Sequence, residues 1–204
     1  MLVSEVTLLP LSPNPRSALL IIDMQEFFFR LPERRVSLED AIANINRLIK
    51  AFDETSQPVV HVISAYRADG SDWDLKMKAS GKAELIEGST EAAILPDIKV
   101  LPQHQVLTKT RYSAFFNTDL ADTLHLGGVE RLVVVGAYTH YCVNATVFDA
   151  YCHDFVPCLV SDAVLSHLPD ESKVMVARML RNGYHVMNTD ELLVELKGNS
   201  PRSE

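Results

Sequence analysis

Apolar runs and amphipathic segments alternate along the whole chain. Six short apolar runs, bounded by polar residues or turn formers, predict strands at residues 17–22, 58–63, 105–108, 131–135, 155–160 and 184–187. Apolar residues at helical spacing predict helices at residues 37–52, 118–126, 142–153, 169–181 and 189–196. This alternation favours an α/β fold, and we expect a three-layer, Rossmann-like domain with an open, mostly parallel six-stranded sheet and helices on both faces.

The pattern runs through the chain without a break, so we predict a single domain over residues 1–204. Prolines at positions 10, 13 and 15 predict an extended lead-in over residues 1–15, and residues 197–204 are expected to form a mobile tail. Ser37, with Asp40 three residues later, is expected to cap the first long helix.

The composition narrows the classes of function. The formal net charge of −8 argues against a nucleic-acid-binding surface, which needs clustered Lys and Arg. No apolar stretch approaches the roughly 20 residues of a membrane span, and residues 1–15 lack the features of a signal peptide. The cysteines at positions 142, 152 and 158 have no zinc-site spacing and fit reduced thiols. We therefore predict a cytoplasmic protein with a small-molecule substrate and no nucleic-acid or membrane partner.

Three chemically reactive residues fall at the ends of predicted strands. Asp23 ends the first strand, Lys109 ends the third, and Cys142 follows the fourth. Each has an ordinary alternative, as a helix cap, a solvated lysine or a small apolar core residue. In an open α/β sheet, however, ligands bind outside the carboxyl ends of the strands. We therefore expect the three side chains to converge there.

The predicted arrangement suits nucleophilic catalysis. A helix N-terminus and the charge of Lys109 would lower the pKa of Cys142 and favour the thiolate. Asp23 would accept the thiol proton and later deliver it to a departing amine. The backbone N–H groups of Tyr138 and Cys142, in the turn before the helix, would hold the developing oxyanion. These roles describe hydrolysis of an amide-type C–N bond through a thioester.

Three segments together resemble the isochorismatase-like cysteine hydrolases. They are Ala18–Gln25, Lys109–Phe116 and Gly136–Val143, and the resemblance extends from about Ser17 to Tyr184. It implies the triad Asp23–Lys109–Cys142 in the roles given above. It also implies a cis peptide bond between Ala137 and Tyr138, and assembly into a homo-oligomer.

The chain departs from two subfamilies of these hydrolases. Nicotinamidases hold a metal through an Asp-x-His motif after the second strand, and residues 64–70 contain no such motif. His61 lies within the predicted strand, so we predict no metal and no other cofactor. Isochorismatases hydrolyse a vinyl ether with Asp and Lys, and usually have a small residue in place of the cysteine. Residues 109–115, with Tyr138 and His140, favour that chemistry, whereas Cys142 argues against it.

Three functions are therefore open. The first is a hydrolase of a small amide, the second an isochorismatase-type vinyl-ether hydrolase, and the third a catalytically idle member of the fold that acts through protein contacts. The intact triad argues against the third. The predicted substrate contacts, each with a competing structural or surface role, are Gln25, Phe28, Arg67, Tyr112 and Tyr138. Arg67 would bind a substrate carboxylate or else be solvated, and the substrate itself does not follow from the sequence.

Overall fold

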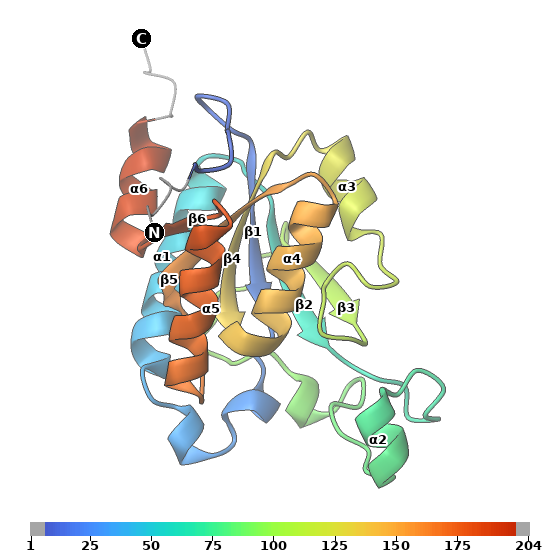
Figure 1. Ribbon diagram of the computed structural model, residues 1–204. Helices are drawn as coiled ribbons and strands as arrows, with labels where there is room; N and C mark the ends of the chain where they lie inside the picture. Colours follow the sequence, from blue (N-terminus) through green and yellow to red (C-terminus); the bar gives the residue numbers. More distant parts are fainter. Residues whose placement is uncertain (1–6, 199–204) are drawn as a thin grey trace, which may run out of the picture.

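A computed structural model describes residues 7–198 of the protein (Figure 1). Six strands form one open sheet in the order β3-β2-β1-β4-β5-β6, and every neighbouring pair is parallel. The strands are β1 (Ser17–Ile22), β2 (Val59–Ser64), β3 (Gln105–Lys109), β4 (Arg131–Ala137), β5 (Val156–Leu165) and β6 (His185–Met187). The predicted fold class is confirmed, with a sheet that is parallel throughout.

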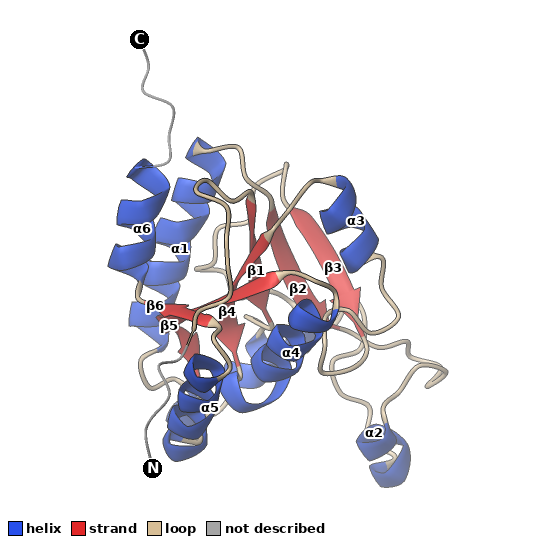
Figure 2. Ribbon diagram, turned by 45° about the horizontal axis from the view of Figure 1, so that its top comes forward, coloured by secondary structure: helices blue, strands red, loops and turns tan. Residues whose placement is uncertain are grey.

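Helices cover both faces of the sheet, as Figures 1 and 2 show. One apolar core joins the sheet to α1 (Leu38–Glu54) and α6 (Thr189–Gly198). A second core joins it to α3 (Leu120–Leu126), α4 (Asn144–Cys152) and α5 (Pro169–Arg181). The sheet is therefore apolar on both faces, which explains why its strands lack polar alternation in the sequence.

β1 shows how one strand serves both cores. Its six residues are all buried, and successive side chains point to opposite faces. Leu19 and Ile21 pack on the α1 side, whereas Leu20 and Ile22 pack on the α4 side. This central position fixes the point at which the chain leaves the sheet, immediately before Asp23.

Several predicted boundaries differ from the structure. Ser37 does occupy the N-cap position of α1, but it has a left-handed φ of 61° and makes no capping bond through its side chain. β4 and β5 run beyond their apolar runs, to Ala137 and Leu165. The helix predicted from Cys142 begins instead with a π-helical turn, Thr139–Val143, which passes into α4. Local apolar spacing does not distinguish this turn from an α-helix.

The long connection after β2 contains a short helix that was not predicted. α2 (Leu75–Ser80) is capped by the Asp74 side chain, which accepts a hydrogen bond from the Met77 amide. Single 3-10 turns lie at Glu26–Phe29, Pro32–Arg34 and Thr90–Ala92. α2 projects from the body beyond the carboxyl ends of the strands (Figure 1). These short elements carry too few residues for a periodic signal.

The described part of the lead-in lies beside β6, where the Leu9 amide donates to Gly183 O at 2.8 Å and Leu9 O contacts His185 Nε2. Residues 1–6, and residues 199–204 of the predicted tail, lie outside the described residues. Lys197 and Gly198 belong to α6, so the predicted start of the tail was wrong. No helix within residues 7–198 is long and apolar enough to cross a membrane.

Candidate active site

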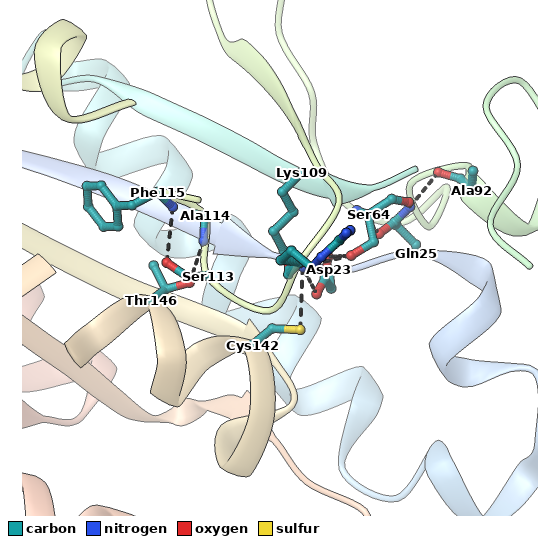
Figure 3. A network of polar contacts seen from close by, with 11 residues as sticks. Asp23, Gln25, Ser64, Ala92, Lys109, Ser113, Ala114, Phe115, Cys142 and Thr146 are labelled. Atoms are coloured by element: carbon teal, nitrogen blue, oxygen red, sulfur yellow. Dashed lines mark hydrogen bonds and ion pairs between the residues drawn. The ribbon is translucent and has the colours of Figure 1, made fainter. Parts of the chain in front are cut away.

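The predicted triad residues lie together at the carboxyl edge of the sheet (Figure 3). Asp23 follows β1, Lys109 is the last residue of β3, and Cys142 lies in the π-helical turn after β4. The parallel register brings the strand ends level, since Ser64 at the end of β2 pairs with Lys109. The topology thus assembles residues that lie far apart in the sequence.

The ammonium group of Lys109 is the centre of the site. Its Nζ lies 2.9 Å from Asp23 Oδ2 and 3.4 Å from Cys142 Sγ, and it donates to Ser64 Oγ at 2.7 Å. A fourth contact, to Arg111 O, is 3.1 Å long. The Lys109 and Asp23 side chains are 1% and 0% exposed. A buried ion pair is tolerated when further hydrogen bonds support it. Here Lys109 also donates to Ser64 Oγ and Arg111 O, and Asp23 Oδ1 accepts from Ser64.

Ser64 is a member of the site that was not predicted. Its hydroxyl accepts from Lys109 and donates to Asp23 Oδ1 at 2.9 Å, so it bridges the two charged groups. Both bonds fix the direction of the carboxylate and the ammonium group. Ser64 ends a strand at the same edge as Asp23 and Lys109, so the strand-end rule could have identified it.

Gln25 holds Ser64 in place and does not line the cavity, contrary to its predicted substrate contact. Its side-chain Oε1 accepts from the Ser64 amide at 2.8 Å, and its Nε2 donates to Ser64 O at 2.9 Å. Nε2 also donates to Ala92 O at 2.8 Å, which ties the returning connection to the same point. Gln25 is fully buried by these bonds, so its side chain has no free donor for a substrate.

The electrostatics of Cys142 differ from the prediction. Burial raises the pKa of the thiol, the Asp23 charge raises it further, and Lys109 offsets only part of this. Cys142 is 6% exposed, and α4 begins two residues after it. These effects favour the neutral thiol, which is opposite in direction to the expected lowering of the Cys142 pKa. Burial alone would lower the pKa of Lys109, but Asp23 and Cys142 act against it and the pKa is raised, so the lysine stays charged.

The turn that carries Cys142 is held by close backbone packing. Gly136 has a φ of 104°, and a Cβ atom there would lie 2.1 Å from Ile22 O, so β1 and β4 approach closely only because this residue is glycine. The peptide bond between Ala137 and Tyr138 is cis. Thr139 Oγ1 then donates to Leu165 O at 3.0 Å, which anchors the turn to the end of β5.

A second set of contacts joins the helix after Cys142 to the loop after Lys109 (Figure 3). The Ala114 amide donates to Thr146 Oγ1 at 3.1 Å, and the Phe115 amide donates to Ser113 Oγ at 3.1 Å. Thr146 lies in the first turn of α4. The segments that carry Lys109 and Cys142 are therefore joined by the Ala114–Thr146 bond as well as by the Lys109–Cys142 contact.

A cavity of about 610 Å³ opens above Cys142, Lys109 and Ser64. Its aromatic lining consists of Phe27, Phe28, Tyr66, Tyr112, Tyr138 and Tyr141. Phe28, Tyr112 and Tyr138, three of the predicted substrate contacts, are among the residues that line this cavity. The exposed Arg67 is not among the lining residues. Its amide donates to the Asp72 side chain and its carbonyl oxygen accepts from the Trp73 side chain, so its backbone is part of a local turn. Arg34 and Arg111 supply the guanidinium groups of the cavity instead.

His61 lies in β2, away from the cavity. It is 1% exposed, and its Nε2 lies 3.0 Å from His104 Nδ1, while His104 Nε2 contacts Asp53. Burial, followed by the neighbouring His104, lowers the pKa of His61 to about 4. Residues 7–198 contain no group of three or more His, Cys, Asp or Glu side chains placed to hold a metal ion.

Several known proteins are similar to this chain in sequence and in fold. A family model described as the isochorismatase domain matches residues 17–191. The phenazine biosynthesis protein PhzD of Pseudomonas fluorescens is 30% identical over 188 residues, which cover 88% of this chain and 86% of that protein. A probable isochorismatase of Pseudomonas chlororaphis is 29% identical over 88% of this chain and 86% of its own length. The solved structure of the pyrazinamidase of Pyrococcus horikoshii, in complex with zinc, is 25% identical, with a TM-score of 0.74 over 85% of this chain and 99% of its own.

Proposed function

The chain belongs to the isochorismatase domain family of hydrolases, and we propose that it cleaves an amide-type C–N bond of a small molecule through a thioester on Cys142. The observation that carries this proposal is the position of Lys109 Nζ, which contacts both Asp23 Oδ2 and Cys142 Sγ at the floor of the cavity. A nucleophile, a base and a cation that serves both are the parts this reaction needs.

The reaction begins with a proton transfer. Asp23 takes the proton of the Cys142 thiol as Sγ attacks the carbonyl carbon, and Lys109 stabilises the sulfur while it is charged. The electron pair of the C=O bond moves to oxygen, where the backbone N–H groups of Tyr138 and Cys142 would hold the oxyanion. Collapse of this intermediate breaks the C–N bond, and protonated Asp23 gives its proton to the departing nitrogen.

Water completes the cycle. Asp23, again a carboxylate, removes a proton from a water molecule that attacks the thioester carbon. The C–S bond breaks, the proton returns to sulfur, and the acid product leaves. Ser64 contributes by holding the carboxylate and the ammonium group in one direction through its two hydrogen bonds. Gln25 contributes indirectly, because its side chain holds the backbone of Ser64 in place through two hydrogen bonds.

A second candidate is hydrolysis of a vinyl ether by Asp23 and Lys109 without the sulfur. Two observations favour it: Asp23, Ser64 and Lys109 are joined by contacts that do not involve Cys142, and burial and the Asp23 charge raise the pKa of the thiol. The chain also resembles a probable isochorismatase at 29% identity. A catalytically idle protein would show neither activity.

Substitution of the cysteine separates the two chemistries. Wild type, Cys142→Ala and Asp23→Asn are assayed against a panel of small amides and vinyl ethers, with Cys152→Ala as the control because Cys152 is an exposed free thiol. Amide hydrolysis that is abolished in both site variants, and unchanged in the control, supports the thioester mechanism. Hydrolysis of a vinyl ether that survives Cys142→Ala and is lost in Asp23→Asn would transfer the function to the second candidate.

Three further features remain predictions: a homo-oligomer, a cytoplasmic location, and activity without a metal or cofactor. Light scattering of the purified protein tests the first, and localisation of the tagged chain in cells tests the second. Activity retained after dialysis against a chelator tests the third. Loss of activity with the chelator, restored by a divalent ion, would contradict the prediction of a metal-free site.

A further inference from the structure

The cavity has a different charge from the rest of the protein. The chain carries a formal net charge of −8. Among the residues that line the cavity, the cationic ones nevertheless outnumber the acidic ones. The cationic residues are Arg34, Lys76, Lys82, Lys109 and Arg111, and the acidic residues are Asp74 and Glu84. A concave site with a surplus of positive charge concentrates anions, because low-dielectric walls focus the field within it. The charge of the lining thus indicates an anionic ligand.

Several of these cations are already engaged. Lys109 serves the ion pair with Asp23. The Arg111 guanidinium donates to the backbone oxygens of Thr110 and Asp72, and Lys76 donates to the Tyr112 hydroxyl at 3.1 Å. A side chain that is committed to the protein in this way helps to shape the cavity. It has less capacity to bind a ligand directly.

Arg34 is a lining guanidinium with more of its donors free. It lies in the 3-10 turn Pro32–Arg34, is half-buried, and forms no ion pair with a carboxylate within residues 7–198. The guanidinium of Arg34 has five N–H donors, and its hydrogen bond to the Tyr138 hydroxyl uses only part of them. The remaining face can offer two parallel N–H donors to the two oxygens of a carboxylate. Arg34 is therefore positioned as the recognition group of the cavity.

His167 completes this corner of the cavity. Its ring packs edge-on against Tyr138, with centroids 4.6 Å apart, and its Nδ1 is buried without a hydrogen-bond partner in the described structure. Burial lowers the pKa of His167, the Arg34 charge lowers it further, and Glu171 acts in the opposite direction. Arg34 and His167 both line this cavity. Tyr138 lies beside both, and its hydroxyl donates to Phe28 O.

The remaining walls include several apolar side chains. Phe28, Tyr66, Met77 and Leu85 line the cavity together with the polar groups. A volume of about 610 Å³ is within the usual range for a small-molecule site. A ligand that lies between these walls can extend from Cys142 on the floor to the corner formed by Arg34 and His167.

We propose that the substrate is a small carboxylate with an apolar body, whose carboxylate is bound by Arg34 beside His167 while its scissile group lies at Cys142. This inference rests on the proposed function for the scissile group, but the binding of the anion itself does not require the thiol. The carboxylate corner lies at Tyr138 and Phe28, and the predicted contact Arg67 takes no part in it.

Binding of benzoate and benzamide tests this assignment, because the two probes have the same ring and differ in charge. Their dissociation constants are measured by titration calorimetry in wild type, Cys142→Ala, Arg34→Gln and Arg34→Lys. Arg67→Gln is the matched control, since it removes the same charge from an exposed side chain that does not line the cavity. Thermal melting of each variant verifies that the fold is retained.

Benzoate is expected to bind more tightly than benzamide to wild type and equally well to Cys142→Ala. Arg34→Gln should weaken benzoate by roughly tenfold to a hundredfold, the loss typical of a hydrogen bond to a charged group, and leave benzamide unchanged. The benzoate affinity of Arg34→Lys should lie between those of wild type and Arg34→Gln, and the benzoate affinity of Arg67→Gln should match that of wild type. Absence of benzoate binding, equal binding of both probes, or an equal loss in Arg67→Gln would overturn the proposal. Failure of amide hydrolysis alone would leave this result intact, so the two proposals are separable.

Discussion

Replacing Asp23 with asparagine should make Cys142 more reactive and the enzyme inactive. The carboxylate has two effects on the thiol that act in opposite directions. As a charge, it raises the pKa of Cys142 and keeps the sulfur protonated. As the base of the proposed mechanism, it removes the proton of the thiol. An asparagine side chain would retain the shape of the aspartate and lose both properties.

The structure sets the size of the first effect. Asp23 Oδ2 and Cys142 Sγ both contact Lys109 Nζ, at 2.9 and 3.4 Å. They therefore lie no more than about 6 Å apart, and two like charges at that separation repel by roughly 3 kcal/mol at an effective dielectric constant of about 20. Removal of the carboxylate charge should then raise the thiolate fraction at neutral pH by about a hundredfold, since each 1.4 kcal/mol is worth about a factor of ten.

The assay is alkylation by iodoacetamide, followed at the Cys142 peptide by mass spectrometry. A Cys152→Ala background removes the exposed thiol. Wild type should react slowly at neutral pH because its thiol is protonated, and Asp23→Asn should react about a hundredfold faster while it turns over no amide. Addition of Lys109→Met to Asp23→Asn should reverse the gain, because the lysine is the cation that stabilises the thiolate.

Two results would refute this reasoning. A wild-type thiol that is alkylated as fast as Asp23→Asn would show that the carboxylate does not hold the sulfur protonated. Unchanged amide turnover in Asp23→Asn would show that another group accepts the proton. Either result removes Asp23 from the role that the geometry gives it.

Two other substitutions test the framework of the site. Ser64→Ala removes the hydroxyl that bridges Asp23 and Lys109; turnover should fall by roughly tenfold to a hundredfold, because hydrogen bonds to charged groups are worth about 1.5–3 kcal/mol. KM should change little, Ser64→Thr should restore most of the rate, and steady-state kinetics that show a change in KM alone would contradict a positioning role. Gly136→Ala places a Cβ atom 2.1 Å from Ile22 O, so we expect a loss of about 4 kcal/mol or more in the free energy of unfolding by urea. The matched control is Gly88→Ala, where φ is also positive but no atom lies within 4 Å, and an equal loss in both variants would contradict the proposed clash.

The sequence was informative wherever a rule connects position to topology. Asp23, Lys109 and Cys142 were grouped because parallel strands bring their carboxyl ends to one edge. Their juxtaposition follows from strand order and register, for which the apolar runs supply the strands. The same rule applied to β2 would have added Ser64. Its small hydroxyl gave no chemical reason to select it before its two charged partners were placed.

The side chains that line the cavity could not be predicted in the same way. Arg67 was selected because it follows β2, but the segment after it folds back through bonds from its backbone to Asp72 and Trp73. That turn brings Arg111 against Asp72 O and leaves Arg67 outside the cavity. Arg34 reaches the cavity from a 3-10 turn that carries no periodic signal. Which side chain faces a cavity depends on such long-range contacts and not on spacing along the chain.

The state of Cys142 is a property of burial, which local sequence does not encode. The nearby lysine and the following helix suggested a thiolate. A thiolate in the closed site would, however, leave two negative groups against one buried cation. A thiol leaves Asp23 and Lys109 as a neutral pair, which is the less costly arrangement where water is excluded. The resting triad is therefore neutral as a whole.

In the proposed mechanism, this neutrality explains how a buried cysteine can still act as a nucleophile. When the proton passes from sulfur to Asp23, the ion pair between Asp23 and Lys109 becomes an ion pair between the thiolate and Lys109, and the total charge of the triad does not change. Because Lys109 Nζ contacts both atoms, neither it nor its partners need to move far during the exchange. The negative charge then passes to the carbonyl oxygen of the substrate and finally back to Asp23.

A substrate carboxylate near this path would disturb the exchange by repelling the thiolate. A site that acts on anions must therefore bind the carboxylate elsewhere, at a cation of its own. Arg34 provides such a cation beside Tyr138, where it can neutralise the substrate without competing with Lys109 for the sulfur.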